Sequence, residues 1–423
     1  MLNLSKVYKA LEAKRALIEN YSSQNLSNLK RLFALCEKLN EINHENFNKF
    51  IEASNDSFSG AIATEELTAR GLVIETIDQN FDVKAWKEQI LKDRITFATD
   101  GSQIEPDKNL NLFLGAVQCG WFINFHNAEQ APIKDVEFEI ILAEEPSEES
   151  DKELRQEIAF QRFDKEIRTL ARLIEEYGGA NLPAKSSPSP LDRGNQILKS
   201  PLACQGEGVG GEVTITERGK LPIAFFDGSL TLSFVKEAKW KRRYTESVNY
   251  LISKSFEYKV PVVGFIDTSL ASNLTKSLQV AFDSTSNIKI SDAAFLGKFL
   301  SNWGSRSAFF KYYEKTENSV SESQIGFVYL KNSSRKNKPS RVELPLWVYE
   351  EDLLDEVLSV VLAESLVGNG YPYPIEVADS IAVLQKPERE LFYELVGKRT
   401  EQEISLSSKQ NSKNIRRRPK IVV

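Results

Sequence analysis

Ile95-Thr-Phe-Ala-Thr-Asp-Gly-Ser102 is a short β-prone run that stops at Asp-Gly-Ser, and the same ending recurs in Leu221-Pro-Ile-Ala-Phe-Phe-Asp-Gly-Ser229. Apolar and β-branched runs that end in turn residues are typical of strands. The glycine lets the backbone turn sharply, which leaves each aspartate at the exposed end of its strand. If the two strands are neighbours in one sheet, Asp100 and Asp227 meet.

The segments around these two runs follow one another in an informative order. They are strands at 95–99, 112–125 and 136–142, a helix at 153–177, a strand at 221–226, a helix at 236–258 and a strand at 260–266. Three strands followed by helix, strand, helix and strand is the ribonuclease H-like arrangement of an α/β fold. We therefore predict a ribonuclease H-like core with a mixed sheet.

Further segments flank this core. Residues 1–90 have apolar residues at helical spacing, which predicts an N-terminal helical arm. Residues 91–400 form the main domain, with C-terminal additions after the last core strand. Residues 181–219 are rich in Pro and Gly and have no period, and residues 401–423 are polar and end in a basic cluster. We expect disorder in both of these segments.

Composition excludes several classes of protein and of chemistry. With 41% apolar and 27% charged residues the chain is globular, and no apolar run approaches the roughly 20 residues that span a bilayer. We expect a soluble, cytoplasmic protein, because the first residues also lack the plan of a signal peptide. Three dispersed cysteines and two histidines encode neither a disulfide framework nor a structural zinc site. Any chemistry must therefore use carboxylates.

The two Asp-Gly-Ser endings have two readings. A single Asp-Gly is most often a plain turn. Two of them on neighbouring strands place Asp100 and Asp227 within a few Å, and like charges that close together are tolerable only with a metal ion between them. The pair therefore favours a site for a hard divalent cation.

Other carboxylates could complete such a site. Glu166 borders the apolar stripe of the helix at 153–177, and Glu157 is the reserve candidate on the same helix. Asp379 lies in a helix that begins after the rigid turn Gly370-Tyr-Pro-Tyr-Pro374. Each of these residues alone could equally be a solvated residue of a helix.

Three motifs in a fixed order resemble a known family. They are Ala98-Thr-Asp-Gly-Ser-Gln-Ile104, Phe226-Asp-Gly-Ser-Leu230 and Gly370-Tyr-Pro-Tyr-Pro374. Together they resemble the NurA nuclease domain, over roughly residues 97–383. The resemblance implies a DNA nuclease that depends on Mn²⁺ or Mg²⁺. It also implies a homodimer that works with a hexameric HerA-like ATPase and translocase in DNA end resection and double-strand break repair.

The resemblance also implies roles for single residues. Asp100, Glu166, Asp227 and Asp379 match the positions of metal ligands, and Tyr371 matches the tyrosine of the C-terminal motif. These five residues are the predicted catalytic set. Asp379 stands where many members carry histidine, but a carboxylate still binds a hard cation.

DNA binding would need local positive charge, since the net charge is −6. Two basic clusters are candidates, one after the strand at 221–226 and one in the loop before 341, and the residues we predict to contact DNA are Lys239, Arg242, Arg243, Lys336 and Arg341. Charged helices and loops are often only solvated, so neither cluster alone decides the matter. The chain has no Walker motif, so movement along DNA would require a partner ATPase.

Two other functions fit the same sequence. A NurA-like subunit with weakened catalysis could seat DNA or a translocase, and Asp379 in place of histidine favours it. A phosphotransferase of a related fold could use the strand-end aspartates near nucleotide phosphates. Metal-dependent DNA cleavage, or nucleotide binding without it, separates these functions from a nuclease.

Overall fold

The computed structural model describes most of the chain. The described residues are 2–54, 58–65, 73–74, 82–106, 113–142, 148–179, 197–198, 213–214, 220–232, 235, 237–283, 287–316 and 319–400. The segments in which we expect disorder, residues 181–219 and 401–423, lie outside the described residues, apart from two short strands. These strands, β6 (Ile197–Leu198) and β7 (Val213–Thr214), form an antiparallel pair.

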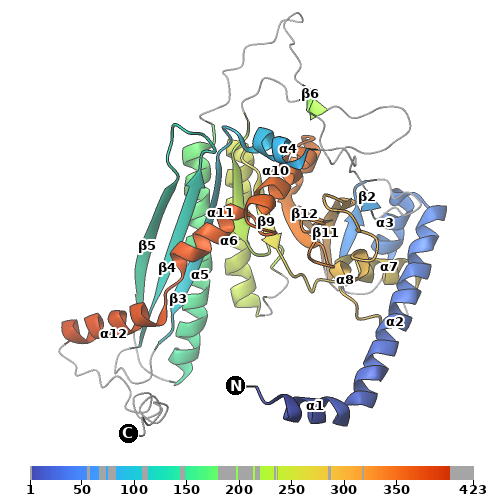
Figure 1. Cartoon of the computed structure of the whole chain (residues 1–423), viewed down its shortest axis with the longest axis horizontal. Helices are drawn as coiled ribbons and strands as arrows, with labels where there is room; N and C mark the ends of the chain where they lie inside the picture. Colours follow the sequence, from blue (N-terminus) through green and yellow to red (C-terminus); the bar gives the residue numbers. More distant parts are fainter. Residues whose placement is uncertain are drawn as a thin grey trace, which may run out of the picture.

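One mixed sheet of 11 strands organises the described part of the chain (Figure 1). Its main order is β1-β11-β12-β13-β9-β8-β3-β4-β5, and β10 pairs with both β12 and β2. The strands are β1 (Phe58–Ala63), β2 (Val73–Ile74), β3 (Thr96–Ile104), β4 (Leu114–Asn124), β5 (Ile133–Leu142), β8 (Ile223–Asp227), β9 (Val262–Ile266), β10 (Arg306–Ser307), β11 (Phe310–Thr316), β12 (Ser319–Leu330) and β13 (Ser340–Pro345).

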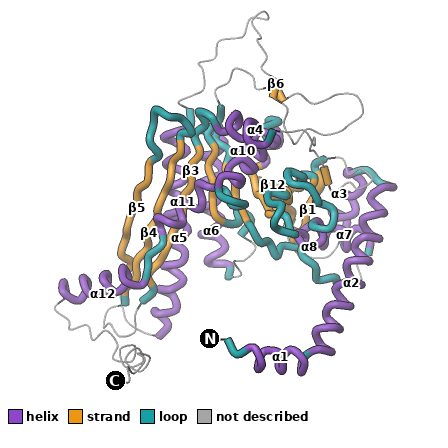
Figure 2. Tube along the Cα trace, viewed as in Figure 1, coloured by secondary structure: helices purple, strands orange, loops and turns teal. Residues whose placement is uncertain are grey.

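Helices lie on both faces of this sheet (Figure 2). They are α1 (Leu4–Ala13), α2 (Arg15–Glu37), the 3₁₀ helix η1 (Lys38–Glu41), α3 (His44–Ala53), α4 (Val83–Leu91), α5 (Glu148–Tyr177), α6 (Ala238–Tyr258), α7 (Asn273–Phe282), α8 (Asp292–Leu296), α9 (Leu346–Glu350), α10 (Leu354–Val367), α11 (Tyr373–Ala382) and α12 (Lys386–Thr400). No described helix is both long and apolar enough to cross a membrane.

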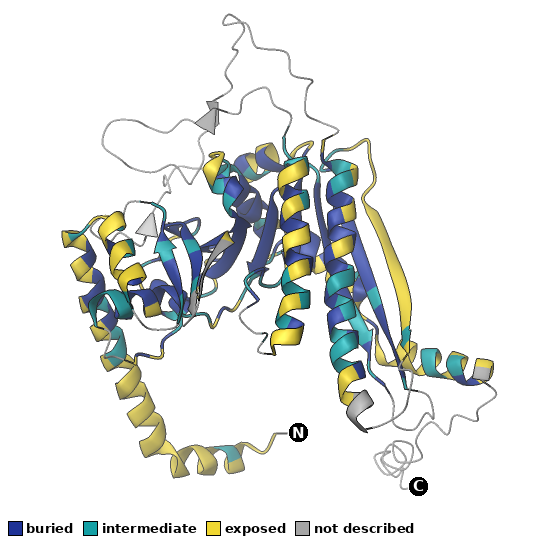
Figure 3. Cartoon of the chain, turned by 180° about the vertical axis from the view of Figure 1, so that it is seen from behind, coloured by how far each residue is buried: buried dark blue, intermediate teal, exposed yellow. Residues whose placement is uncertain are grey.

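The predicted core is confirmed. Strands β3, β4 and β5 form an antiparallel meander, and β8 joins β3 in parallel, followed by β9 in parallel to β8. Helices α5 and α6 cover one face of these strands, and α10 and α11 cover the other (Figures 1 and 3). This is the ribonuclease H-like order, and the parallel pairing brings the carboxyl ends of β3, β8 and β9 side by side.

The side chains of the core strands alternate between the two faces. Phe97 and Phe226 pack in the cluster under α5 and α6, whereas Ala98 and Phe225 pack in the cluster under α10 and α11. The period of two puts Asp100 and Asp227 on the same face as Ala98 and Phe225. The two aspartates therefore face α11, while α5 lies behind them.

The other half of the sheet differs from the prediction. The expected helical region through residue 90 is wrong at β1, which pairs with β11 and fixes its backbone by a hydrogen bond from Ala61 N to Ser277 Oγ of α7 (2.8 Å). The sequence pattern also predicts a helix over residues 291–303 and a strand over residues 341–349. The helix, α8, ends at Leu296, and the strand, β13, ends at Pro345, where α9 begins. Local patterns missed these features because long-range pairing decides them.

The helical arm is partly attached to this half. Leu32, Leu35 and Leu39 are buried in the cluster formed with α3, α7 and α8. By contrast α1 has no buried residue, and it projects away from the sheet with the start of α2 (Figure 3). Only the second half of α2 therefore belongs to the core.

Candidate active site

Asp100 and Asp227 lie side by side, as the sequence predicted. Thr99 of β3 is paired with Phe226 of β8 in parallel register, so the next residues, Asp100 and Asp227, are neighbours across the two strands. Burial raises the pKa of Asp100 to about 7, with the charges of Asp227 and Asp379 adding to the rise. The pKa of Asp227 is also raised, first by the protein packed around its carboxyl group and then by Asp379. The two carboxylates therefore repel each other as they stand.

Glu166 reaches the same place from the other face of the sheet. It lies on α5 and is 4% exposed, and burial raises its pKa to about 8, with Asp100 and Asp227 adding to the rise. Gly101 makes room for it, because a Cβ at that position would lie 2.3 Å from Glu166 Oε1. The strand end expected at Asp100-Gly101-Ser102 is wrong, because β3 continues through these residues to Ile104 and pairs with β4 along them. Gly101 is therefore required by the close approach of Glu166 and not by a turn.

Arg162 offsets part of this negative charge. Its Nη1 atom donates a hydrogen bond to Gly101 O (3.1 Å) and lies 3.3 Å from Glu166 Oε1. Its charge lowers the pKa of Asp100, Glu166 and Asp227, against the effect of burial. The predicted set omitted Arg162, although its position one turn before Glu166 was a usable signal.

The serine of the first motif positions α11. Ser102 Oγ donates a hydrogen bond to Ala382 O (2.5 Å), and Gln118 Nε2 donates to the same oxygen (3.1 Å). These bonds satisfy a carbonyl at the carboxyl end of the helix and hold α11 across β3 and β4. Asp379, one turn earlier, is consequently close enough for its charge to raise the pKa of both Asp100 and Asp227.

Tyr371 contacts the second aspartate directly. Its hydroxyl donates a hydrogen bond to Asp227 Oδ1 (2.5 Å), and its ring packs edge-on against Phe265 (5.1 Å between ring centroids). Burial raises the pKa of Tyr371, and the charge of Asp227 adds to this. The phenol is therefore kept protonated as a donor to Asp227.

A further aspartate beside the site was missed by the sequence prediction. Asp267 follows β9, next to β8, and its charge raises the pKa of Asp227. It pairs with Lys336 and accepts a hydrogen bond from Ser340 Oγ (3.3 Å). The ending Asp267-Thr268-Ser269 resembles the two Asp-Gly-Ser endings and was the available signal. The pairing also brings Lys336, a predicted DNA contact, to the edge of the site.

The other predicted DNA contacts have different surroundings. Lys239 and Arg242 have side chains 68% and 83% exposed on α6. Arg243 instead forms two hydrogen bonds with Glu157 (2.5 and 2.8 Å) and lies over the ring of Phe160 (3.9 Å to the centroid). Arg243 therefore joins α6 to α5, and the reserve candidate Glu157 is its partner there.

The prediction for Arg341 is wrong. Its side chain is 2% exposed, because it points into the protein and pairs with Glu343 (Nε to Oε1, 2.7 Å). A buried guanidinium cannot contact a DNA backbone. The basic loop before Arg341 suggested an exposed side chain, whereas Arg341 lies in β13 and its side chain is buried.

The acidic residues suit a hard cation by chemistry. All of them offer oxygen atoms, which Mg²⁺ and Mn²⁺ prefer, and the buried Glu166 Oε1 has no hydrogen-bond partner. In the arrangement of the described residues, no three His, Cys, Asp or Glu side chains are yet grouped closely enough to hold a metal ion. Arg162 lies 3.3 Å from Glu166 Oε1 and Tyr371 donates to one oxygen of Asp227, so a bound cation would share these carboxylates with Arg162 and Tyr371.

The chain matches one family model and several solved structures. The model of a family described as NurA domain matches residues 94–384. The NurA nuclease from Sulfolobus solfataricus is 13% identical, with a TM-score of 0.48, over 96% of this chain and 100% of that one. The catalytic domain of human endonuclease V is 12% identical, with a TM-score of 0.30, over 76% and 92%. Ciona intestinalis endonuclease V, in complex with a DNA that contains inosine, is 10% identical, with a TM-score of 0.31, over 75% and 100%. No curated protein matches the chain significantly.

Proposed function

The chain belongs to the NurA domain family, a family of nucleases, and from that premise we propose that it is a divalent-metal-dependent deoxyribonuclease of the exonuclease and single-strand endonuclease type. One observation carries the proposal. Asp100 in the middle of β3, Glu166 on α5 and Asp227 at the carboxyl end of β8 lie close enough to raise one another's pKa values. Protein stability alone gives no reason to collect like charges in this way, whereas catalysis by a bound cation does.

Asp100, Glu166, Asp227 and Asp379 would hold Mn²⁺ or Mg²⁺. A bound ion would neutralise charge on the scissile phosphate and lower the pKa of an attacking water. The ligands must be deprotonated to bind it, so cation binding would release the protons that the raised pKa values retain. Because Asp379 stands in place of histidine, all the proposed ligand atoms are oxygens, which both of these ions prefer.

The other residues of the site would orient these ligands. Tyr371 donates to one oxygen of Asp227 and leaves the other free. Arg162 fixes Glu166 against Gly101 O and limits the repulsion among the carboxylates. Lys336, paired with Asp267 at the edge, offers a positive charge next to the site for a DNA phosphate.

Contacts with DNA and with a partner complete the proposal. The exposed Lys239 and Arg242 would contact the DNA backbone near the acidic site. Since the sequence has no Walker motif, a hexameric HerA-like translocase would move the DNA. We place the enzyme in the cytoplasm, as a homodimer that resects DNA ends in double-strand break repair.

Incubation of the purified protein with end-labelled DNA tests the function. Cleavage is expected with Mn²⁺ or Mg²⁺, none with EDTA, and none in the Asp227→Ala variant. Equal cleavage in EDTA, or by Asp227→Ala, would overturn the metal-dependent mechanism.

A DNA- or translocase-binding subunit with weakened catalysis is the second candidate. It is favoured by Asp379 at the histidine position and by the absence, among described residues, of a ready group of three metal ligands. The same assay separates the two, because such a subunit would bind the labelled DNA and leave it intact with every metal.

A further inference from the structure

The loop after Asp227 folds across the neighbouring strand. Gly228 has a φ of +148°, and the loop continues over Gly264 of β9. A Cβ at Gly264 would lie 3.0 Å from Gly228 O and 2.9 Å from Leu230 Cγ. The direction of the chain beyond the catalytic aspartate is therefore set by a close contact with β9.

Glu343 holds the far end of this loop. It lies on β13, paired with Gly264 in the sheet, and is 1% exposed. Its carboxylate accepts hydrogen bonds from Leu230 N (2.7 Å) and Thr231 N (3.2 Å), and from the hydroxyls of Ser229 (3.0 Å) and Thr231 (3.1 Å). One buried side chain thus binds three consecutive residues that begin two positions after Asp227.

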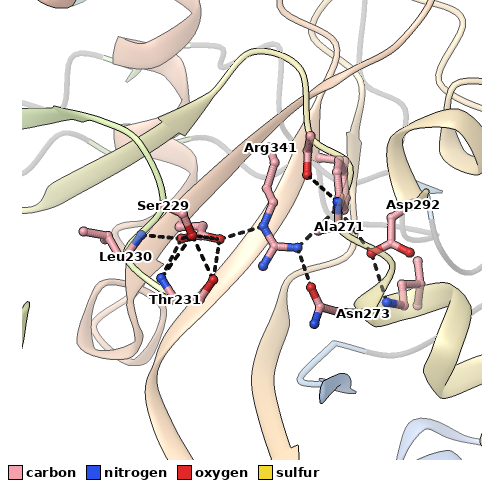
Figure 4. A network of polar contacts seen from close by, with 11 residues as sticks. Ser229, Leu230, Thr231, Ala271, Asn273, Asp292 and Arg341 are labelled. Atoms are coloured by element: carbon pink, nitrogen blue, oxygen red, sulfur yellow. Dashed lines mark hydrogen bonds and ion pairs between the residues drawn. The ribbon is translucent and has the colours of Figure 1, made fainter. Parts of the chain in front are cut away.

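Arg341 holds Glu343 in turn (Figure 4). Besides its bond to Glu343, Arg341 donates to Asn273 Oδ1 (3.0 Å) and to the hydroxyl of Tyr329 (3.2 Å), and it lies 3.7 Å from the ring centroid of Phe327. These contacts come from β12 and from the start of α7. The orientation of Glu343 is consequently fixed by elements outside the ribonuclease H-like core.

The stability of the protein alone does not explain the buried ion pair of Glu343 and Arg341. Removing two charges from water is costly, and a buried ion pair often stabilises a protein no more than apolar residues of similar volume would. Two features tie the pair to the site instead: it binds the loop of a catalytic aspartate, and most of its bonds to that loop go to backbone or short side chains that cannot shift far. Ligands of a metal need such support for their direction.

We propose that Glu343, held by Arg341, is a positioning residue that sets the direction of the Asp227 carboxylate by fixing the loop at residues 229–231. The inference rests on the proposed function, because the purpose of fixing Asp227 is to bind a cation. It adds a residue that lies two strands away from Asp227 and touches neither metal nor DNA.

Two measurements on the full-length Glu343→Gln variant test this role. The first is Mn²⁺ affinity, measured as free Mn²⁺ by electron paramagnetic resonance at a temperature where the variant is folded. We expect a loss of affinity of about tenfold or more, as for other residues that support metal ligands. The second is hydrogen exchange of the peptide that covers residues 227–232, which should become faster. The double variant Ser229→Ala/Thr231→Val keeps the buried charges and should show a smaller change in the same direction.

Glu364→Gln is the matched control. Glu364 is also a fully buried carboxylate, bound by Thr96 Oγ1 (2.7 Å) and His126 Nε2 (2.8 Å), but it has no contact with the loop. The Glu364→Gln variant should lose thermal stability but bind Mn²⁺ with an affinity within about twofold of the wild-type protein. Wild-type affinity in Glu343→Gln, or an equal loss in both variants, would overturn the positioning role.

Failure of the proposed function would look different. In that case the wild-type protein would bind no Mn²⁺ at the site, and the affinity measurement would show no difference between proteins. Hydrogen exchange would still test whether Glu343 fixes the loop. If residues 227–232 exchange at the same rate in Glu343→Gln as in the wild-type protein, Glu343 does not fix this loop.

Discussion

Two clusters of charged side chains lie on the same sheet, and they differ in how their charges are balanced. Around Arg341, the carboxylate of Glu343 meets a guanidinium and four further donors. Beside the middle of β3 and the end of β8, the carboxylates of Asp100, Glu166 and Asp227 have one another, Arg162 and the hydroxyl of Tyr371 as neighbours. Glu166 Oε1 is buried without a hydrogen-bond partner.

This difference in charge balance indicates a structural role for the first cluster and a catalytic role for the second. A buried charge that has all its donors is part of the scaffold, and its removal should cost stability. Like charges that lie close together with few donors destabilise the protein on their own, and such groups are common at functional sites. We therefore expect substitutions in the first cluster to change folding, and substitutions in the second to change catalysis.

The largest effect is expected at the aspartates. Asp100→Asn and Asp227→Asn should each lower Mn²⁺-dependent DNA cleavage by about a thousandfold, because several kcal/mol of transition-state stabilisation would depend on the metal they hold. Cleavage rates under single-turnover conditions provide the measurement.

Asp164→Asn is the control for this prediction. Asp164 lies on α5 two residues before Glu166, but it binds Arg168 (2.6 Å) and Ser247 (2.6 Å) away from the site. It should retain cleavage within a few-fold. Full activity of the two site variants would show that the unbalanced cluster is not catalytic.

The second effect concerns the balanced cluster. Arg341→Gln should lower the free energy of unfolding by about 3 kcal/mol or more, since it leaves Glu343 buried without its partner. Urea unfolding followed by circular dichroism measures this. Arg162→Gln, at the edge of the unbalanced cluster, should cost far less stability. A loss of similar size in both variants would remove the distinction between the clusters.

The third effect is a dependence of stability on pH. The folded protein retains protons on Asp100 and Glu166 up to about pH 7 and 8, whereas the unfolded chain releases them near pH 4. In metal-free buffer the free energy of unfolding should therefore fall as the pH rises from about 4 to 8, by up to about 1.4 kcal/mol per pH unit for each group. Glu166→Gln removes one of these contributions, so its advantage over wild type should grow with pH. A constant difference between pH 5 and pH 8 would argue against the raised pKa of Glu166.

Addition of Mn²⁺ should reverse this trend. A ligand that binds only the folded state stabilises it, and deprotonated carboxylates bind the cation better. The rise in melting temperature on adding Mn²⁺ should thus be larger at pH 8 than at pH 6 in the wild-type protein, and absent in Asp227→Asn. An equal rise in Asp227→Asn would place the cation elsewhere.

The smallest effect is expected on α6. Lys239→Ala and Arg242→Ala should each weaken DNA binding a few-fold. Each should also reduce the slope of log affinity against log salt concentration by about 1, the value for one lost phosphate contact. Arg243→Ala, which breaks the pair with Glu157, should instead lower stability. Fluorescence anisotropy with labelled DNA at several salt concentrations distinguishes the two results.

The sequence was most informative where an apolar strand ends in a polar turn. β8 and β9 could be predicted because each is a continuous apolar run that ends in turn residues, and β5 because apolar and charged residues alternate along it. β1 could not, since its residues form a strand by pairing with β11, which lies about 250 positions later in the chain.

The same limit applies to single residues. Asp100 and Asp227 were found because their motif repeats, whereas Asp267 lacks the glycine of that motif. Arg341 was misread because a basic residue beside a basic loop looks exposed. Glu343 lies two residues later, on the same face of the strand, and was the sign that the charge is paired inside the protein.

The most direct test of the cation site is a crystal of this protein soaked in Mn²⁺ and measured at the manganese absorption edge. We expect an anomalous peak between Asp100 and Asp227, within bonding distance of Glu166 or Asp379. A fully occupied Mn²⁺ elsewhere, with Asp100 and Asp227 still bonded only to protein groups, would contradict it.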